Sequence, residues 1–232
     1  NENANIDGAS APIYNEMRPS VHGGVVHSQP AVVDFGGTNG TIAFYGADDG
    51  VFHAVDGGQT DTEGIELWGL IAPEIYSKFD RLRDNGLDSD GDGTFAPLIS
   101  FPGVTSSPAP IPKDYFFDGS IGVYQNSGTV WIYPSMRRGG RAIYAFDVST
   151  PTSPAMKWRK GCFTSDTTDD TVCSAGWSDI GQTWSTPHTA FLSGYVDGGG
   201  NPKPVLVFGG GYDQCEDTNN QTRCTGARKG DG

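Results

Sequence analysis

Short strand-like runs separated by turns containing Gly and Asp recur along the chain, and few folds can accommodate this repeat. The runs are rich in β-branched and aromatic residues, which favour β-strands. The first unit holds four runs, at 27–35, 41–45, 51–56 and 65–71; the second holds four, at 118–125, 129–133, 141–147 and 155–159; the third holds two, at 184–192 and 204–208. Without the long insertions, each unit is about 45 residues long, the size of a four-stranded propeller blade. The repeat therefore predicts an all-β fold, a partial β-propeller of about two and a half four-stranded blades.

Single residues also repeat from unit to unit. Ser28, Ser120 and Ser185 stand at equivalent places near the start of each first strand, and Asp56 and Asp147 close the third strands. Matches at fixed places are expected of a repeat architecture. An antiparallel sandwich with irregular strands is the alternative interpretation.

We interpret residues 1–232 as a fragment of one β-propeller domain. Its expected parts are a blade at 27–71, an insertion at 72–114, a blade at 117–159, a Cys-containing insertion at 160–181 and a partial blade at 184–232. A propeller needs at least four blades to close into a ring. The remaining blades are therefore expected in the same parent polypeptide.

The composition argues against several classes of protein. The 34 glycines and 15 prolines disfavour an all-helical fold. Asp and Glu outnumber Lys and Arg by 28 to 15, and the resulting net charge of −13 repels nucleic-acid phosphates and anionic lipid surfaces. Nucleic acid is therefore not expected as a partner.

The cysteines fall into two close pairs, Cys162 with Cys173 and Cys215 with Cys224, within polar stretches that contain no His. The C-x2-C spacing of zinc sites is absent. An even number of cysteines in loops favours two local disulfides, and these are typical of an oxidising compartment. Four free thiols are the alternative.

An acidic loop in the first insertion predicts a calcium site. Asp88, Asp90 and Asp92 alternate with other residues, and the carbonyl oxygen of Thr94 would add a fourth ligand, in the manner of a D-x-D-x-D-G calcium loop. Ala96 and Ile99 stand where an EF-hand has further ligands, so water or a distant acid would complete the shell. A solvated acidic turn is the alternative.

A helix is expected to lead into this loop. Pro73 is suited to a first helical turn, and Ile75, Phe79 and Leu82 follow at helical spacing. The first insertion is therefore predicted to be a helix followed by a calcium loop.

Catalytic motifs are absent. The sequence contains no G-x-S-x-G elbow, no Walker loop and no H-E-x-x-H helix, so an enzyme is not predicted. The four histidines are scattered, and each is expected to complete a strand hydrogen bond rather than to bind a metal. The tryptophans are expected to pack between blades, and the pair Arg137–Arg138 is expected to be solvated at a hairpin tip.

Six motifs occur together in one order: HSQP at 27–30, YGADDGVFHAVD at 45–56, DGS at 118–120, GGRAIYAFDV at 139–148, GQTWSTP at 181–187 and FGGGYD at 208–213. Their order closely resembles the C-terminal β-propeller of the PilY/PilC family of type IV pilus biogenesis and tip adhesin proteins. The resemblance covers about residues 20 to 213.

The resemblance implies a role and a location. It implies a type IV pilus biogenesis factor and pilus-tip adhesin module, secreted through the periplasm to the bacterial cell surface. The implied partners are minor pilins at the pilus tip and a host or abiotic surface. The family's calcium loop maps onto Asp88, Asp90, Asp92 and Thr94, where Ca²⁺ would modulate pilus extension and retraction. A periplasmic quinoprotein-like or carbohydrate-binding propeller is the alternative.

Overall fold

The computed structural model describes residues 22–58, 60, 64–79, 86–87, 96–97, 114–164, 169–213 and 230. Almost all regular structure in these residues is β. The first sheet contains β1 (Ala31–Gly36), β2 (Gly40–Gly46), β3 (Phe52–Asp56) and β4 (Glu66–Leu70) in chain order, with each strand antiparallel to the next. The second contains β7 (Ile121–Asn126), β8 (Thr129–Pro134), β9 (Arg141–Asp147) and β10 (Ala155–Cys162), again in chain order. The third contains the antiparallel pair β11 (His188–Val196) and β12 (Pro202–Val207).

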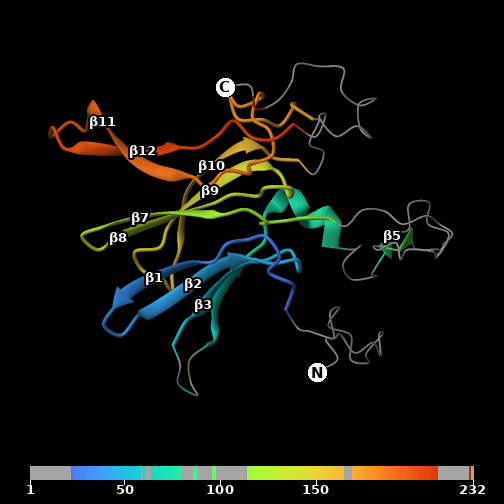
Figure 1. The fold of residues 1–232 in the computed structure, drawn as a ribbon, viewed down its shortest axis with the longest axis horizontal. Coiled ribbons are helices and arrows are strands. Elements are labelled where there is room, and N and C mark those ends of the chain that lie inside the picture. The colour runs from blue at the N-terminus through green and yellow to red at the C-terminus, as the bar shows by residue number, and fades with distance from the viewer. Residues whose placement is uncertain are drawn as a thin grey trace.

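The arrangement of these sheets confirms the predicted fold class, an all-β partial propeller. Figure 1 shows the sheets succeeding one another across the molecule, with β7 and β8 between β1–β3 and β11–β12. The strands that contact between sheets are the first of each unit, β1 with β7 and β7 with β11. Since first strands surround the axis of a propeller, these contacts are those expected of successive blades rather than of two stacked layers.

The second sheet is buried on both faces. Ile132 and Tyr144 lie in the larger core cluster, between the first and second sheets, whereas their chain neighbours Tyr133 and Ile143 lie in a smaller cluster that includes Leu206 from the third sheet. Side chains alternate between faces along a strand, so β8 and β9 supply both cores. This accounts for their nearly continuous run of apolar residues.

Two of the three repeated serines make the same hydrogen bond. The Ser28 hydroxyl oxygen accepts a hydrogen bond from the backbone N–H of Gly46 at 2.9 Å, and that of Ser185 accepts one from Gly209 at 2.8 Å. Each of these two serines thus connects the start of its unit to a glycine at, or just after, the end of the second strand. Ser120 differs, because its carbonyl oxygen accepts a backbone N–H and its hydroxyl donates to a glutamine side chain.

The repeated aspartates close the third strands in the same way. Asp56 accepts the backbone N–H of Gly58 at 3.0 Å, and Asp147 accepts that of Ser149 at 3.0 Å. A short side chain that bonds the backbone two residues ahead initiates a turn. The predicted hairpin between β2 and β3 is also present, and Gly50 occupies the left-handed conformation there with φ of 89°.

Close packing joins the first sheet to the segment before β7. A Cβ atom on Gly46 would collide with the carbonyl oxygen of Phe117, so a side chain at position 46 would separate the two units. The Phe117 ring lies 5.4 Å from that of Phe52, and the Trp68 indole N–H donates to the Pro151 carbonyl at 2.7 Å. These contacts fix one blade against the next.

The insertion begins with a 3-10 helix, η1 (Pro73–Lys78), where the sequence predicts a helix. Ile75, in the middle of η1, is fully buried. Leu82 lies outside the described residues. Further along, β5 (Gly86–Leu87) pairs antiparallel with β6 (Ala96–Pro97).

Candidate functional site

The four predicted calcium ligands, Asp88, Asp90, Asp92 and Thr94, lie outside the described residues. The short strands on either side of them are described, and Leu87 pairs with Ala96. The calcium site therefore stays a prediction.

One of the two predicted disulfides is confirmed. Cys162, at the end of β10, is bonded to Cys173, and its side chain is buried. Asp170 lies beside this bridge and forms an ion pair with Arg141 at 2.8 Å. Both sulfurs are committed to the disulfide, so this group of side chains has no thiolate to offer a metal. Cys215 and Cys224 lie outside the described residues.

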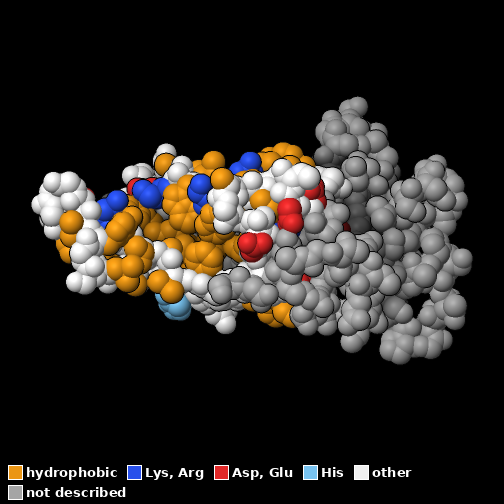
Figure 2. Space-filling model, turned by 90° about the horizontal axis from the view of Figure 1, so that it is seen from above, with side chains coloured by type: hydrophobic (Ala, Val, Ile, Leu, Met, Phe, Trp, Pro, Cys, Tyr) orange, Lys and Arg blue, Asp and Glu red, His pale blue; other side chains and the backbone are white. Residues whose placement is uncertain are grey.

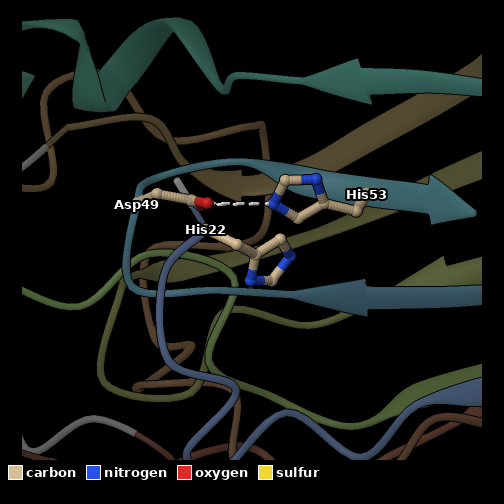
Figure 3. A group of neighbouring side chains, drawn as sticks. All are labelled: His22, Asp49 and His53. Atoms are coloured by element: carbon tan, nitrogen blue, oxygen red, sulfur yellow. Dashed lines mark hydrogen bonds and ion pairs between the residues drawn. The ribbon is translucent and has the colours of Figure 1, made fainter. Parts of the chain in front are cut away.

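Three side chains from separate stretches of the chain meet at the β2–β3 hairpin. His22 comes from the segment before β1, Asp49 from the turn between β2 and β3, and His53 from β3. In Figure 3 the Asp49 carboxylate points at a ring nitrogen of His53, and the His22 ring lies beside the His53 ring. The two ring centroids are 4.6 Å apart.

Hydrogen bonds fix the Asp49 carboxylate in place. It accepts backbone N–H groups from Gly23 at 2.9 Å and from Val51 at 3.0 Å. Burial alone would raise the pKa of Asp49, but the hydrogen bonds from His53 and these two backbone groups lower it to about 2. The side chain is therefore an oriented carboxylate at neutral pH.

His53 lies between two carboxylates and is only 5% exposed. Its Nε2 atom is 3.2 Å from Asp49 Oδ2, and its Nδ1 atom is 3.1 Å from Glu66 Oε1 in β4. Burial alone would lower the pKa of His53, but the hydrogen bonds and charges of Asp49 and Glu66 raise it overall. The second carboxylate fixes the orientation of the imidazole ring.

His22 completes the cluster from the other side. Its Nε2 atom is 3.0 Å from the Tyr45 hydroxyl, and its Nδ1 atom is 2.6 Å from the Gly23 carbonyl oxygen. Burial and the negative charges of Glu66 and Asp49 raise the pKa of Tyr45, so its hydroxyl stays neutral. One potential ligand atom from each of His22, Asp49 and His53 lies within 4.8 Å of the others, and this group of residues could hold a metal ion.

The sequence interpretation of the histidines missed this cluster. His27 and His53 contact carboxylates instead of the expected strand backbone. The sequence contains one signal for this cluster: Asp49 and His53 belong to one predicted hairpin, and a tight turn brings the residues around it close together. Nothing in the sequence connects His22 to that hairpin.

A second polar cluster joins all three units. Asp118, which is 6% exposed, lies 3.0 Å from His27 Nδ1 and accepts from Arg137 at 3.1 Å. The Arg137 guanidinium lies 4.0 Å from the ring centre of Trp184. The sequence predicts that Arg137 is solvated at a hairpin tip. Instead, its side chain pairs with Asp118 and stacks on Trp184.

The third sheet presents hydrophobic side chains to solvent. In Figure 2, which views the molecule from the side of β11 and β12, they gather over this sheet. The exposed large hydrophobic residues of these two strands are Phe191, Leu192, Tyr195, Val196 and Val207. Exposed apolar patches of this kind are typical of surfaces that contact other protein. No helix among the described residues has the length and apolar character needed to cross a membrane.

Comparison with known proteins finds sequence similarity to proteins of the kind that the motifs resemble. No family model matches the chain. The type IV pilus biogenesis factor PilY1 of Pseudomonas aeruginosa strain UCBPP-PA14 is 26% identical over 219 residues, which cover 84% of this chain and 16% of that protein. PilY1 of strain PAO1 is 24% identical over 180 residues, which cover 78% of this chain and 12% of that protein. The chain thus spans less than a fifth of the length of these relatives.

A solved structure is also similar. The crystal structure of the Pseudomonas aeruginosa PilY1 C-terminal domain matches with 21% identity and a TM-score of 0.39, covering 75% of this chain and 26% of that one. The sequence similarities to PilY1 extend over most of the chain. They confirm the resemblance of this chain to the PilY/PilC family of type IV pilus biogenesis proteins.

Proposed function

We propose that this chain is part of a type IV pilus biogenesis factor. The observation that carries the proposal is its similarity to PilY1 over 84% of its length. The chain covers a small share of those proteins, so the role belongs to a longer polypeptide, of which the propeller is one module. Fold alone would not support this role, because propellers serve many functions.

The propeller is proposed to act outside the cytoplasm, as a tip adhesin module. The Cys162–Cys173 disulfide supports this location, because such bridges persist in oxidising compartments. The proposed partners are minor pilins at the pilus tip and a host or abiotic surface. The net charge of −13 is consistent with a partner other than nucleic acid.

The exposed sheet of β11 and β12 is proposed to pack against remaining blades of the parent polypeptide. The second sheet has a neighbouring sheet on each side and buries both of its faces. In the third sheet, by contrast, more than half of the surface of Phe191 and of Leu192 is exposed. Covering such side chains would contribute about 25 cal/mol for each Å² removed from water.

Calcium is proposed to bind at Asp88, Asp90, Asp92 and Thr94. The alternating carboxylates support this, and the β5–β6 pair returns the two ends of the segment to one another. A bound ion would neutralise crowded carboxylates and order the insertion. Through that ordering, calcium would modulate pilus extension and retraction.

A genetic experiment tests both parts of the proposal. In the source bacterium, we expect deletion of the full-length gene to abolish surface pili and the wild-type gene to restore them. The triple variant Asp88→Ala, Asp90→Ala, Asp92→Ala should restore pili that no longer respond to a calcium chelator, whereas the Asp34→Asn control should respond like wild type.

The possible failures of this experiment are distinct. Normal surface pili in the deletion strain would overturn the biogenesis role. A triple variant that responds to the chelator as wild type does would overturn only the calcium site. Pilus number by electron microscopy and twitching motility are the measurements.

A further inference from the structure

The cluster at the β2–β3 hairpin offers ligands of a different kind from those of the predicted calcium loop. It provides two imidazoles and one carboxylate, and one ligand atom of each lies within 4.8 Å of the others. Two His and one carboxylate, with water as the fourth ligand, are a common donor set for zinc. We propose that His22, Asp49 and His53 bind a zinc-class divalent ion.

The spacing of two of the ligands already suits such an ion. Bonds of about 2.0 to 2.1 Å in a tetrahedral site place neighbouring ligand atoms about 3.3 Å apart. The His53 Nε2 atom lies 3.2 Å from Asp49 Oδ2 and 3.3 Å from Oδ1. An ion can thus bridge these two side chains with little movement of either. A ring nitrogen of His22 lies within 4.8 Å of both ligand atoms, so this ring would move closer to complete the site.

The surroundings orient the ligands as they do in natural zinc sites. Histidine ligands of metals nearly always donate their second ring N–H to a carboxylate, carbonyl or water. Glu66 lies 3.1 Å from His53 Nδ1 and fills that place, so Nε2 faces the proposed ion. Backbone N–H groups of Gly23 and Val51 hold the Asp49 carboxylate. Two carboxylates, Asp49 and Glu66, also make this region attractive to cations.

The chemistry of the ligands separates this site from the calcium loop. Ca²⁺ takes six to eight oxygen ligands, whereas imidazole nitrogen suits zinc, copper, nickel and cobalt. Millimolar calcium should therefore not displace the ion. Once bound, the ion would join the segment at His22 to the β2–β3 hairpin and so strengthen the start of the first blade.

Cobalt titration of the whole chain tests the proposal. The chain is first treated with a chelator, and Co²⁺ is added at neutral pH while the visible absorption of tetrahedral cobalt is followed. We expect saturable binding of one ion, displaced by Zn²⁺ and unaffected by calcium. His22→Gln and His53→Gln should weaken binding by at least tenfold, and Glu66→Gln by about 10- to 100-fold.

His188→Gln is the matched control, because His188 is exposed in β11 and remote from the cluster in the fold. It should bind Co²⁺ as wild type does. His22→Gln keeps the test informative if His53→Gln fails to fold, because His22 lies outside the strands, and circular dichroism checks each variant. Absence of saturable cobalt absorption, or equal affinity of His22→Gln and His188→Gln, would overturn the proposal. Either result leaves the calcium proposal unaffected.

Discussion

Tyr133 shows how one buried residue makes stability depend on pH. It is 5% exposed in β8, and burial, aided by the charge of Tyr124, raises its pKa from 10.0 to about 12. Its phenol ionises near pH 10 in the unfolded chain but stays neutral to higher pH in the folded chain. Its contribution to stability is therefore complete below pH 10 and is lost as the pH rises toward about 12.

Tyr133→Phe should flatten this alkaline loss. Over the interval between the two pKa values, the wild-type free energy of unfolding should fall faster than that of the variant, by about 1 kcal/mol per pH unit. Burial and the neighbouring Glu74 also raise the pKa of Tyr144. Tyr144 therefore adds to the alkaline fall in the free energy of unfolding of both proteins. Urea unfolding followed by fluorescence at several pH values measures the slopes. Tyr76→Phe, at a tyrosine 59% exposed, is the control, and identical slopes for Tyr133→Phe and wild type would contradict the prediction.

At the scale of the element, the disulfide holds the end of β10 against the segment that follows it. Cys162 and Cys173 are separated by 11 residues, and closing a loop of this size stabilises the fold by about 3 kcal/mol. The double variant Cys162→Ala, Cys173→Ala should lower the free energy of unfolding in urea by about that amount. A double variant as stable as wild type would show that the bridge does not stabilise the fold. Cys215→Ala, Cys224→Ala is the companion variant, because it leaves the observed bridge intact.

The strands were predictable because runs of β-branched and aromatic residues favour strands and turns containing Gly and Asp separate these runs. The order of strands in each sheet also follows from the repeat, since successive strands in a blade pair with their chain neighbours. The start of the first strand in each unit was less predictable, since the sequence predicts starts at 27 and 118 whereas β1 and β7 begin at Ala31 and Ile121. In the third unit the sequence predicts a strand from Trp184, whereas β11 begins at His188, because the Trp184 N–H bonds to the carbonyl oxygen of Gln182 and Pro187 has no N–H to donate to a neighbouring strand.

At the scale of the whole molecule, the contacts between side chains that are distant in sequence were the least predictable features. Asp118 meets His27 and Arg137, and His22 meets Asp49, only because the fold returns distant segments to one another. Charges distant in sequence have no spacing rule, so neither cluster was predictable from single motifs. The Cys162–Cys173 disulfide was predictable, because its two cysteines are close in sequence.

Glu74 is the residue through which η1 holds the second sheet. Its carboxylate is 2% exposed; it accepts a hydrogen bond from the Tyr144 hydroxyl at 2.6 Å and pairs with Arg159 at 3.2 Å. Glu74→Ala removes the acceptor from a buried phenol and the counter-charge from a guanidinium, and should cost about 2 to 4 kcal/mol in urea unfolding. Glu74→Gln keeps an acceptor oxygen and loses only the charge, so it should cost less. If Glu74→Ala were as stable as wild type, or Glu74→Gln as damaging as Glu74→Ala, η1 would not join the insertion to the second sheet through this carboxylate.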